Sequence, residues 1–319
     1  MPSRHISGHA CRRREEAAAA PAARDWADGL GTDMLLAILS RVDHVDILMS
    51  GDSVCRTWRR AARDEPTLWR RVVMRGGHAG TMPRRLIRCG AACEALRRSA
   101  GLCEAFCVEY AADDGFLIYL SEMAPYLKNL RLICCNNVTD QGFTEAVKEL
   151  PLLEELELSL CDTVCISRVY KTVGDACIQL KHFRLSKRTA IYFLWTEMDK
   201  DVPGIASMRR LRSLQLFSNT LSSEGLETIL DNCPQLEYLD IRGCCNIYMG
   251  RSLHVKCAKI KKIRFPGDSI DDYDLKAQTC ARRVSSPTMS RGNHNELRPF
   301  RGNYYRYFNR DKLFPPLSR

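Results

Sequence analysis

The sequence predicts an α+β protein of several domains, in which a small all-helical domain precedes an open α/β solenoid of about seven repeats. Two observations support this prediction. A short motif with apolar residues at i, i+3 and i+5 recurs every 24 to 31 residues through the middle of the chain. A stretch of short helical patterns, with two tryptophans among several arginines, stands before the first repeat. The length of 319 residues is enough for two or three domains, and the hydrophobic content of 45% is that of a globular protein.

The helical domain is expected over residues 25–75. The segments DMLLAILSRV and DSVCRTWRRAARD place their apolar residues on one helical face, and Pro66 begins a last short turn. About 50 residues of this kind bury too little surface to fold stably alone. We therefore expect Trp58 and Trp69 to hold a small core, while neighbouring apolar residues are presented to another protein.

The repeats are expected over residues 101–268, after a helical linker over 76–100. Two examples are LEELELSLC, which starts at residue 153, and LRSLQLFSN, which starts at residue 211. All the repeat starts fall at positions 103, 127, 153, 180, 211, 236 and 260. This spacing is the pattern of leucine-rich repeats. In each LxL motif both leucines point to the same side of a short strand, and a helix returns the chain to the next strand. A cysteine or asparagine at i+8 fits the turn after the strand, and these residues are Cys135, Cys161, Asn219 and Cys244.

The strand residues that flank the inward leucines are expected to share one concave surface, because such repeats stack strand beside strand. This surface has an acidic end, an aromatic middle and a basic end, which would suit a charged peptide. A solvated sheet surface without a partner is the alternative. An aromatic insertion at 188–201 adds Trp195, which either contacts a partner or extends the core. The candidate substrate-binding residues are Glu155, Glu157, Arg184, Trp195, Gln215, Phe217, Tyr238, Asp240, Arg242 and Arg264.

The sixteen cysteines include no CxxC pair, so we expect neither a zinc site nor a disulfide scaffold but mostly small buried side chains. The net charge of +10 is concentrated at the ends, with +3 in residues 1–24 and +5 in residues 285–319. We expect the terminal segments 1–24 and 269–319 to be disordered. The segment 298–314 mixes arginines with tyrosines and phenylalanines, which could stack on single-stranded RNA. The alternatives are an alternatively spliced or frameshifted end and a plain disordered tail.

The chain has no apolar run near the roughly 18 residues that span a bilayer, and no secretory h-region at its start. We expect an intracellular protein, in the nucleus, the cytoplasm or both, without membrane contact. No phosphate loop, nucleophile elbow or metal constellation is present in the sequence. The sequence therefore predicts a protein that is not an enzyme and has no cofactor.

The segment GLGTDMLLAILSRV, followed by DILMSGDSVCRTWRRAARDEPTLWRRV, resembles an F-box. With the cysteine-containing repeats and the ending FPGDSIDDYD, residues 25–274 are similar to plant F-box/leucine-rich-repeat proteins. The resemblance implies a substrate adaptor of a Skp–cullin–F-box ubiquitin ligase. Its F-box would bind the Skp linker protein, and through it cullin, while the repeats recruit an unknown protein for ubiquitination and degradation. The implied Skp-facing or Skp-supporting residues are Leu30, Met34, Leu35, Ile38, Leu39, Val54, Cys55 and Trp58.

One residue departs from this resemblance. F-boxes usually begin Leu-Pro, whereas Leu30 is followed here by Gly31. Proline restricts the unfolded chain and glycine frees it, so we expect Skp docking to be weaker by about 1 kcal/mol, or roughly fivefold. Two other functions stay open at this point: an F-box scaffold outside the ligase, and nucleic-acid binding through the basic aromatic C-terminal segment.

Overall fold

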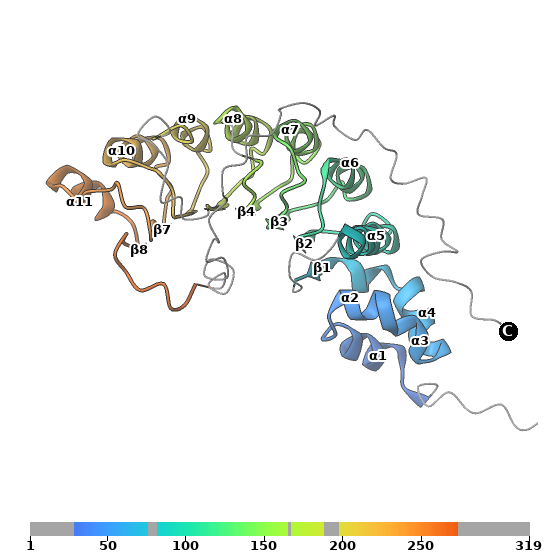
Figure 1. Cartoon of the computed structure of the whole chain (residues 1–319). Coiled ribbons are helices and arrows are strands. Elements are labelled where there is room, and N and C mark those ends of the chain that lie inside the picture. Colours follow the sequence, from blue (N-terminus) through green and yellow to red (C-terminus); the bar gives the residue numbers. More distant parts are fainter. Residues whose placement is uncertain (1–28, 76–81, 165–166, 188–197, 274–319) are drawn as a thin grey trace, which may run out of the picture.

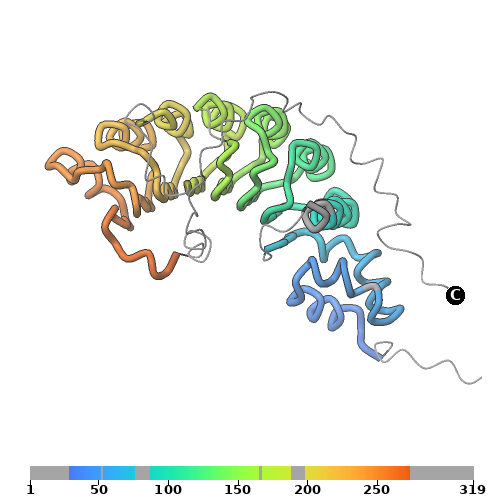
Figure 2. The backbone as a smooth tube through the Cα atoms, viewed as in Figure 1, coloured from blue at the N-terminus to red at the C-terminus, as the bar shows by residue number. Residues whose placement is uncertain are grey.

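The computed structural model describes residues 29–75, 82–164, 167–187 and 198–273. The chain forms an arc with a helical module at one end (Figures 1 and 2). Along the arc a parallel sheet lines the inner, concave side and helices cover the outer, convex side (Figure 1). The predicted fold class, a helical domain followed by an α/β repeat solenoid, is confirmed.

The helical module consists of α1 (Thr32–Leu39), α2 (His44–Asp46), the π-helical turn η2 (Ile47–Gly51), α3 (Asp52–Val54), α4 (Arg56–Asp64) and the 3-10 turn η3 (Pro66–Trp69). Side chains cap two of these helices, Asp43 at α2 and Cys55 at α4. Trp69 is fully buried, and its indole N–H donates to the carbonyl oxygen of Ala62 at 2.9 Å. Trp58 is half-buried against the same core. Both tryptophans therefore support the core of the module.

The described residues contain one sheet of eight parallel strands, in the order of the sequence. The strands are β1 (Arg71–Met74), β2 (Ala105–Glu109), β3 (Asn129–Ile133), β4 (Glu155–Ser159), β5 (His182–Ser186), β6 (Ser213–Phe217), β7 (Tyr238–Asp240) and β8 (Lys262–Arg264). Repeat leucines pair across neighbouring strands, as Leu130 does with Leu156 and Leu132 with Leu158. All four are buried, so the inward side of each LxL motif builds one continuous core.

The strand β1 was not predicted, because its sequence RVVM lacks the LxxLxL spacing. It pairs in parallel with β2 over its whole length, so Val72 and Met74 join the core beside Phe106 and Val108. Since β1 begins two residues after Trp69 ends the last turn of the module, the helical module is continuous with the first strand of the solenoid.

The helices that return the chain between strands are α5 (Met82–Arg98), α6 (Asp114–Met123), α7 (Asp140–Lys148), α8 (Ser167–Ala176), α9 (Val202–Ala206), α10 (Ser223–Asn232) and α11 (Arg251–Cys257). The segment expected to be a helical linker, 76–100, contains α5. This helix connects β1 to β2 and lies beside α6 on the convex side (Figure 1). It therefore acts as the return helix of a first repeat.

The cysteines of the repeats have the packing role that their spacing predicts. After the strands, the thiol of Cys161 lies 3.4 Å from the carbonyl oxygen of Leu132, and that of Cys244 lies 3.1 Å from the carbonyl oxygen of Leu216. Each thiol thus bonds a backbone group of the preceding repeat. At the ends of the return segments the buried cysteines are Cys177, Cys233 and Cys257.

The chain after β8 corrects the predicted start of a disordered tail at residue 269. Residues 265–273, called here the strap, turn back beneath the concave side of the sheet (Figure 1). The strap ends at Tyr273, which is buried against β5 and β6. Its path is fixed in part by Gly243, whose N–H donates to the carbonyl oxygen of Pro266 at 3.1 Å.

Some sequence predictions concern residues outside the described ranges. These are the disorder expected for 1–24, the aromatic insertion with Trp195, and the basic aromatic segment 298–314. Among the helices of the described residues, none combines the length and the apolar composition needed to cross a bilayer.

Candidate protein-interaction surfaces

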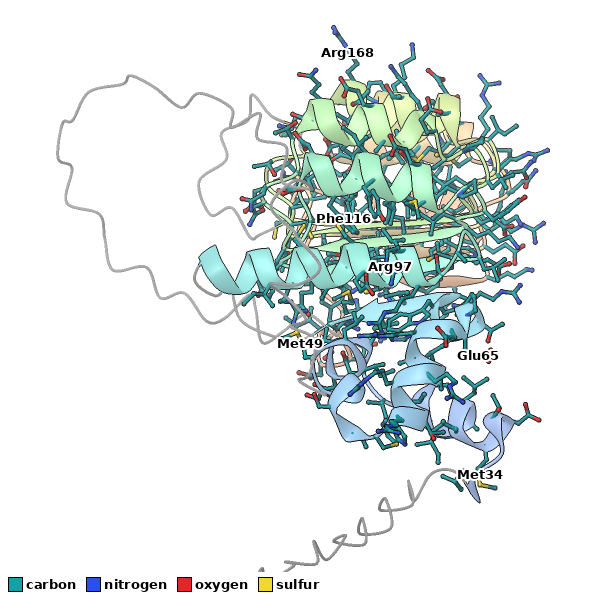
Figure 3. The ribbon with its side chains drawn as sticks, turned by 90° about the vertical axis from the view of Figure 1, so that its right-hand side faces the viewer. Met34, Met49, Glu65, Arg97, Phe116 and Arg168 are labelled. Carbon is teal, nitrogen blue, oxygen red and sulfur yellow. The ribbon has the colours of Figure 1, made fainter. Side chains whose placement is uncertain are left out.

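Helix α1 has two apolar faces with opposite environments. Leu35 and Leu39 are 1% and 0% exposed and lie in the core of the module. Met34 and Ile38, each one residue earlier, are 59% and 38% exposed. Figure 3 shows Met34 at the end of the module farthest from the repeats. Met34 and Ile38 are one helical turn apart and so share a face that a partner can contact.

Of the residues that the sequence predicts for Skp binding, Leu35 and Leu39 thus belong to the core of the module, whereas Met34 and Ile38 are exposed. Leu30 lies half-buried before α1, and Cys55 is half-buried where it caps α4 with its sulfur 3.4 Å from the amide nitrogen of Trp58. Val54 is 47% exposed at the end of α3.

Sequence reasoning missed one exposed apolar residue of the module, Met49 in η2, which is 51% exposed. Its neighbour Leu48 is 1% exposed. Ile47, Leu48 and Met49 are three consecutive apolar residues, and only the first two are buried, so the sequence pattern alone did not single out Met49. The exposed large apolar side chains of the module are Met34, Ile38, Met49 and Val54. Figure 3 shows Met49 at the end of the module near the repeats, apart from Met34.

On the concave side, the strand register aligns one row of side chains across six strands. The row consists of Arg131, Glu157, Arg184, Gln215, Asp240 and Arg264, in that order from β3 to β8. Opposite charges thus stand beside each other at most steps of the row. Cross-strand pairs of this kind stabilise a sheet when their charges are opposite.

The predicted acidic end of this surface is corrected at Glu157. Its side chain is 2% exposed, with one carboxylate oxygen 2.5 Å from Nε of Arg131 and the other 3.7 Å from Nε of Arg184. The hydroxyl of Ser159 donates to the same carboxylate at 2.7 Å. The charge of Glu157 is therefore neutralised inside the protein. Glu155 is half-buried, and its carboxylate accepts a hydrogen bond from the Asn129 amide at 2.7 Å.

The predicted basic end is also paired internally. Asp240 and Arg242 are 1% and 4% exposed, and the guanidinium Nη2 lies 2.8 Å from the Asp240 carboxylate. Arg242 and Arg264 both donate to the carboxylate of Asp272, which belongs to the strap. These two arginines lower the pKa of Asp272 to about 2. Carboxylates from the sheet and the strap thus surround this basic cluster.

The predicted aromatic middle is covered by the strap. The ring of Tyr273 stacks on Phe217, with ring centroids 4.0 Å apart and planes at 14°. Tyr238 stays half-buried on the open side, with the Lys262 ammonium 5.5 Å from its ring centroid. Beside the covered part, a hollow of about 240 Å³ remains open, lined mainly by Arg131, Glu155, Glu157, His182, Arg184, Ser213 and Gln215.

Sequence reasoning missed three residues of this surface: Arg131, Asp272 and Tyr273. Arg131 occupies the same LxL position as Glu157, one repeat earlier, so the repeat alignment could have found it. Asp272 and Tyr273 have partners 30 and 87 residues away in the chain. The ending FPGDSIDDYD, which the family resemblance includes, contains both residues, but nothing in it shows that they contact the concave side. Across the described ranges, no group of three or more His, Cys, Asp or Glu side chains is placed to hold a metal ion.

Comparison with known proteins places both parts of the chain in one family. A model of F-box-like domains matches residues 30–75, and the repeat model "FBD-associated F-box protein At5g56370, LRR repeats" matches residues 166–298. F-box protein SKIP19 of Arabidopsis thaliana is 39% identical over 255 residues, covering 79% of this chain and 80% of that protein. The chain belongs to the F-box/leucine-rich-repeat family. The helical module is its F-box, and the solenoid carries its leucine-rich repeats.

Two more Arabidopsis thaliana members are similarly related to this F-box/leucine-rich-repeat protein. F-box/LRR-repeat protein 22 is 38% identical, with 78% of this chain and 80% of that protein covered. F-box/LRR-repeat protein 23 is 36% identical over 78% of this chain, which spans only 55% of that relative. The resemblance to plant F-box/leucine-rich-repeat proteins that the sequence motifs indicate is thereby confirmed.

Proposed function

We propose that this protein is a non-catalytic substrate adaptor of a Skp–cullin–F-box ubiquitin ligase. The F-box docks on a Skp linker protein, and the concave side of the repeats recruits a protein for ubiquitination. One observation carries the proposal: Met34 and Ile38 leave an apolar face of α1 uncovered inside the segment that matches F-box-like domains.

The physical argument starts from the cost of leaving that face in water. Removing apolar surface from water contributes about 25 cal/mol per Å², so covering the side chains of Met34 and Ile38 on α1 favours association. A partner with apolar helices would cover these side chains. Obligate protein–protein interfaces are built in this way, since they resemble the hydrophobic core of one domain. The adaptor then acts by proximity, because tethering a substrate near a charged conjugating enzyme raises its effective concentration.

The experiment is co-purification of the full chain with a Skp linker protein. The test variant is Met34→Ala with Ile38→Ala, and the matched control is Ile178→Ala, which removes a residue 60% exposed on the repeats. We expect the double variant to bind Skp at least about tenfold more weakly, a loss of about 1.4 kcal/mol, while the control binds normally. Equal binding by all three proteins would overturn the proposed docking face.

A second measurement addresses the ligase role. The Skp complex is mixed with cullin and the conjugation enzymes, and ubiquitin transfer to bound proteins is followed. Skp binding without any cullin-dependent transfer would contradict the adaptor role and favour the scaffold alternative. Binding of single-stranded RNA that falls steeply with salt and disappears on removal of 285–319 would favour the nucleic-acid alternative.

A further inference from the structure

The strap follows a path that ordinary capping of a solenoid does not require. A cap needs to cover only the last strand, β8, yet the strap continues across the concave side to β5 and β6. Figure 2 shows this segment leaving the end of the arc and curving back beneath the sheet. Internal turns hold its shape, with the Phe265 N–H donating to the Asp268 carboxylate at 2.9 Å and the Tyr273 N–H donating to the Ile270 carbonyl at 3.0 Å.

Two consecutive side chains make the specific contacts of the strap, and the first is Asp272. Its two carboxylate oxygens accept separate hydrogen bonds, one from Arg242 and one from Arg264 at 2.5 Å. Arg242 is held in place by Asp240, and it also donates to the carbonyl oxygen of Ser269 at 2.8 Å. The sheet thus presents two neighbouring guanidinium groups, of which Arg242 is held by Asp240, and such a pair favours binding of a carboxylate.

The second side chain is Tyr273, which is 6% exposed. Its ring lies flat on Phe217, and the guanidinium of Arg184 lies over it, 4.7 Å from the ring centroid. The phenol hydroxyl shares a hydrogen bond with Ser186. An aromatic platform, a cation above the ring and a hydroxyl at its far end together form a pocket for an aromatic side chain that carries a polar tip.

The exposure of the strap permits its displacement by a segment of another protein. Asp272 is 56% exposed although both its oxygens are bonded, and the Arg264 side chain beside it is 34% exposed, so a competing carboxylate can approach Arg264 from solvent. Ser269, Ile270 and Asp271 are exposed as well. The side-chain contacts described for the strap therefore come from one carboxylate and one ring on adjacent residues, and the groups that receive them belong to the repeats.

From these contacts we infer that the concave surface over β5 to β8 is a receptor for protein segments in which an acidic residue directly precedes a tyrosine. Asp272 and Tyr273 occupy this receptor as an internal competitor. A partner segment with the same two side chains displaces the strap and places its own ring on Phe217. The inference rests on the proposed function in one respect only, that the repeats recruit a protein.

The test measures binding of a fluorescein-labelled peptide with the sequence of residues 266–275 to the full chain by fluorescence anisotropy. The receptor is opened by Asp272→Asn with Tyr273→Ala, and the native chain is measured beside it. A short tether gives the internal segment an effective concentration in the millimolar range. We therefore expect the opened variant to bind the peptide at least about tenfold more tightly than the native chain. Equal affinities would overturn the inference.

Two matched changes examine which groups receive the peptide. Adding Phe217→Ala to the opened variant removes the aromatic platform and should abolish binding. Adding Tyr248→Ala instead removes an aromatic residue that is 79% exposed and lies outside the contacts of the strap, and should leave binding unchanged. Equal effects of the two substitutions would contradict the assignment of the receptor.

A further pair of peptides separates a receptor from a purely structural clasp. In one, Asp-Tyr is kept and all flanking residues are replaced by glycine and serine; in the other, the flanks are kept and Asp-Tyr becomes Asn-Ala. Binding of the first and not the second supports the inference. Binding of the second, or of neither, would show a clasp that recognises only its own chain.

Because the opened variant could lose stability, a measurement on the native chain accompanies it. Hydrogen exchange of residues 269–273 is followed while unlabelled Asp-Tyr peptide is added. Displacement should accelerate exchange in the strap, and unchanged exchange at saturating peptide would overturn the inference. Neither experiment contains Skp, so its outcome is independent of whether the F-box docks as proposed.

Discussion

The imidazole of His44 accepts a hydrogen bond from the backbone N–H of Val73, with Nδ1 3.4 Å from the amide nitrogen. Its other nitrogen, Nε2, lies 3.3 Å from the carbonyl oxygen of Leu68. Only a neutral ring with its proton on Nε2 satisfies both groups. Through this side chain, helix α2 of the F-box is bonded to the edge strand β1, so His44 fastens the F-box to the first strand of the repeats.

This arrangement predicts that acidification loosens the junction. Burial lowers the pKa of His44 below its ordinary value of 6.5, and this effect outweighs the negative charge of nearby Asp43, which raises the pKa. As the pH falls below 6.5, the unfolded chain therefore takes up this proton before the folded chain does. The contribution of neutral His44 to stability is complete above pH 6.5. It is lost as the pH falls toward the lower pKa that His44 has in the folded chain.

The measurement is the melting temperature of the full chain at about pH 7.5 and about pH 5.5. The variant His44→Gln keeps a donor and an acceptor but does not titrate. Between the two pH values, we expect the melting temperature of the native chain to fall further than that of the variant. Parallel losses would show that other groups dominate the pH response.

Helix α1 should separate stability from binding at neighbouring positions. Leu35→Ala removes a side chain that is 1% exposed and should destabilise the protein by about 2–5 kcal/mol. Met34→Ala removes a side chain that is 59% exposed and should change stability by less than about 0.5 kcal/mol. Urea denaturation of both variants tests this contrast. A large loss for Met34→Ala would mean that the F-box core extends to the face assigned here to Skp.

These two positions also show how far the sequence could predict the site. Helical spacing identified the apolar residues of α1, but Met34 and Ile38 are as apolar as Leu35 and Leu39. Periodicity alone therefore could not decide which pair faced the core. The LxL motifs were more informative, because the alternation of a strand fixes both faces once one is known to be buried. Glu155, Gln215 and their neighbours could be assigned to the concave side on that basis.

Contacts between segments that are distant in the chain could not be predicted from the sequence. β1 becomes a strand because β2 offers it a parallel edge, and its own residues carry no repeat spacing. Tyr273 is buried by groups of β5 and β6, and no local pattern around it predicts that contact. In both segments, contacts with strands that are distant in the sequence determine the conformation more strongly than local sequence preference does.

Replacing Gly31 by proline should strengthen the F-box. Gly31 precedes the first residue of α1 with φ −59° and ψ 149°, and φ is close to the value that a proline ring imposes. A Cβ at this position would meet no atom within 4 Å. Gly31→Pro should thus raise the free energy of unfolding by about 0.4–1 kcal/mol by restricting the unfolded chain. Thermal melts of Gly31→Pro and Gly31→Ala test this, since the alanine variant should gain less. A destabilised proline variant would refute the fit.

Two adjacent cysteines should differ in reactivity. Burial raises the pKa of Cys244 to about 12, so its nucleophilic thiolate is scarce near pH 8. Cys245 is exposed. Brief alkylation of the native chain, followed by fragmentation mass spectrometry, should find the label on Cys245 and not on Cys244. In urea both should react. Labelling of Cys244 under native conditions would indicate that the turn after β7 opens readily.

Glu157 should matter more for stability than its neighbour Glu155. Glu157→Gln leaves Arg131 and Arg184 without the carboxylate between them. Breaking a fully buried ion pair costs about 3–5 kcal/mol. The Arg131 side chain is 29% exposed, so water compensates in part and we expect a loss of about 1–3 kcal/mol. Glu155→Gln, on a half-buried side chain whose amide partner can rearrange, should cost less than about 0.5 kcal/mol. Urea denaturation of the two variants decides between a structural charge row, which predicts this difference, and a solvated sheet surface, which predicts equal and small effects.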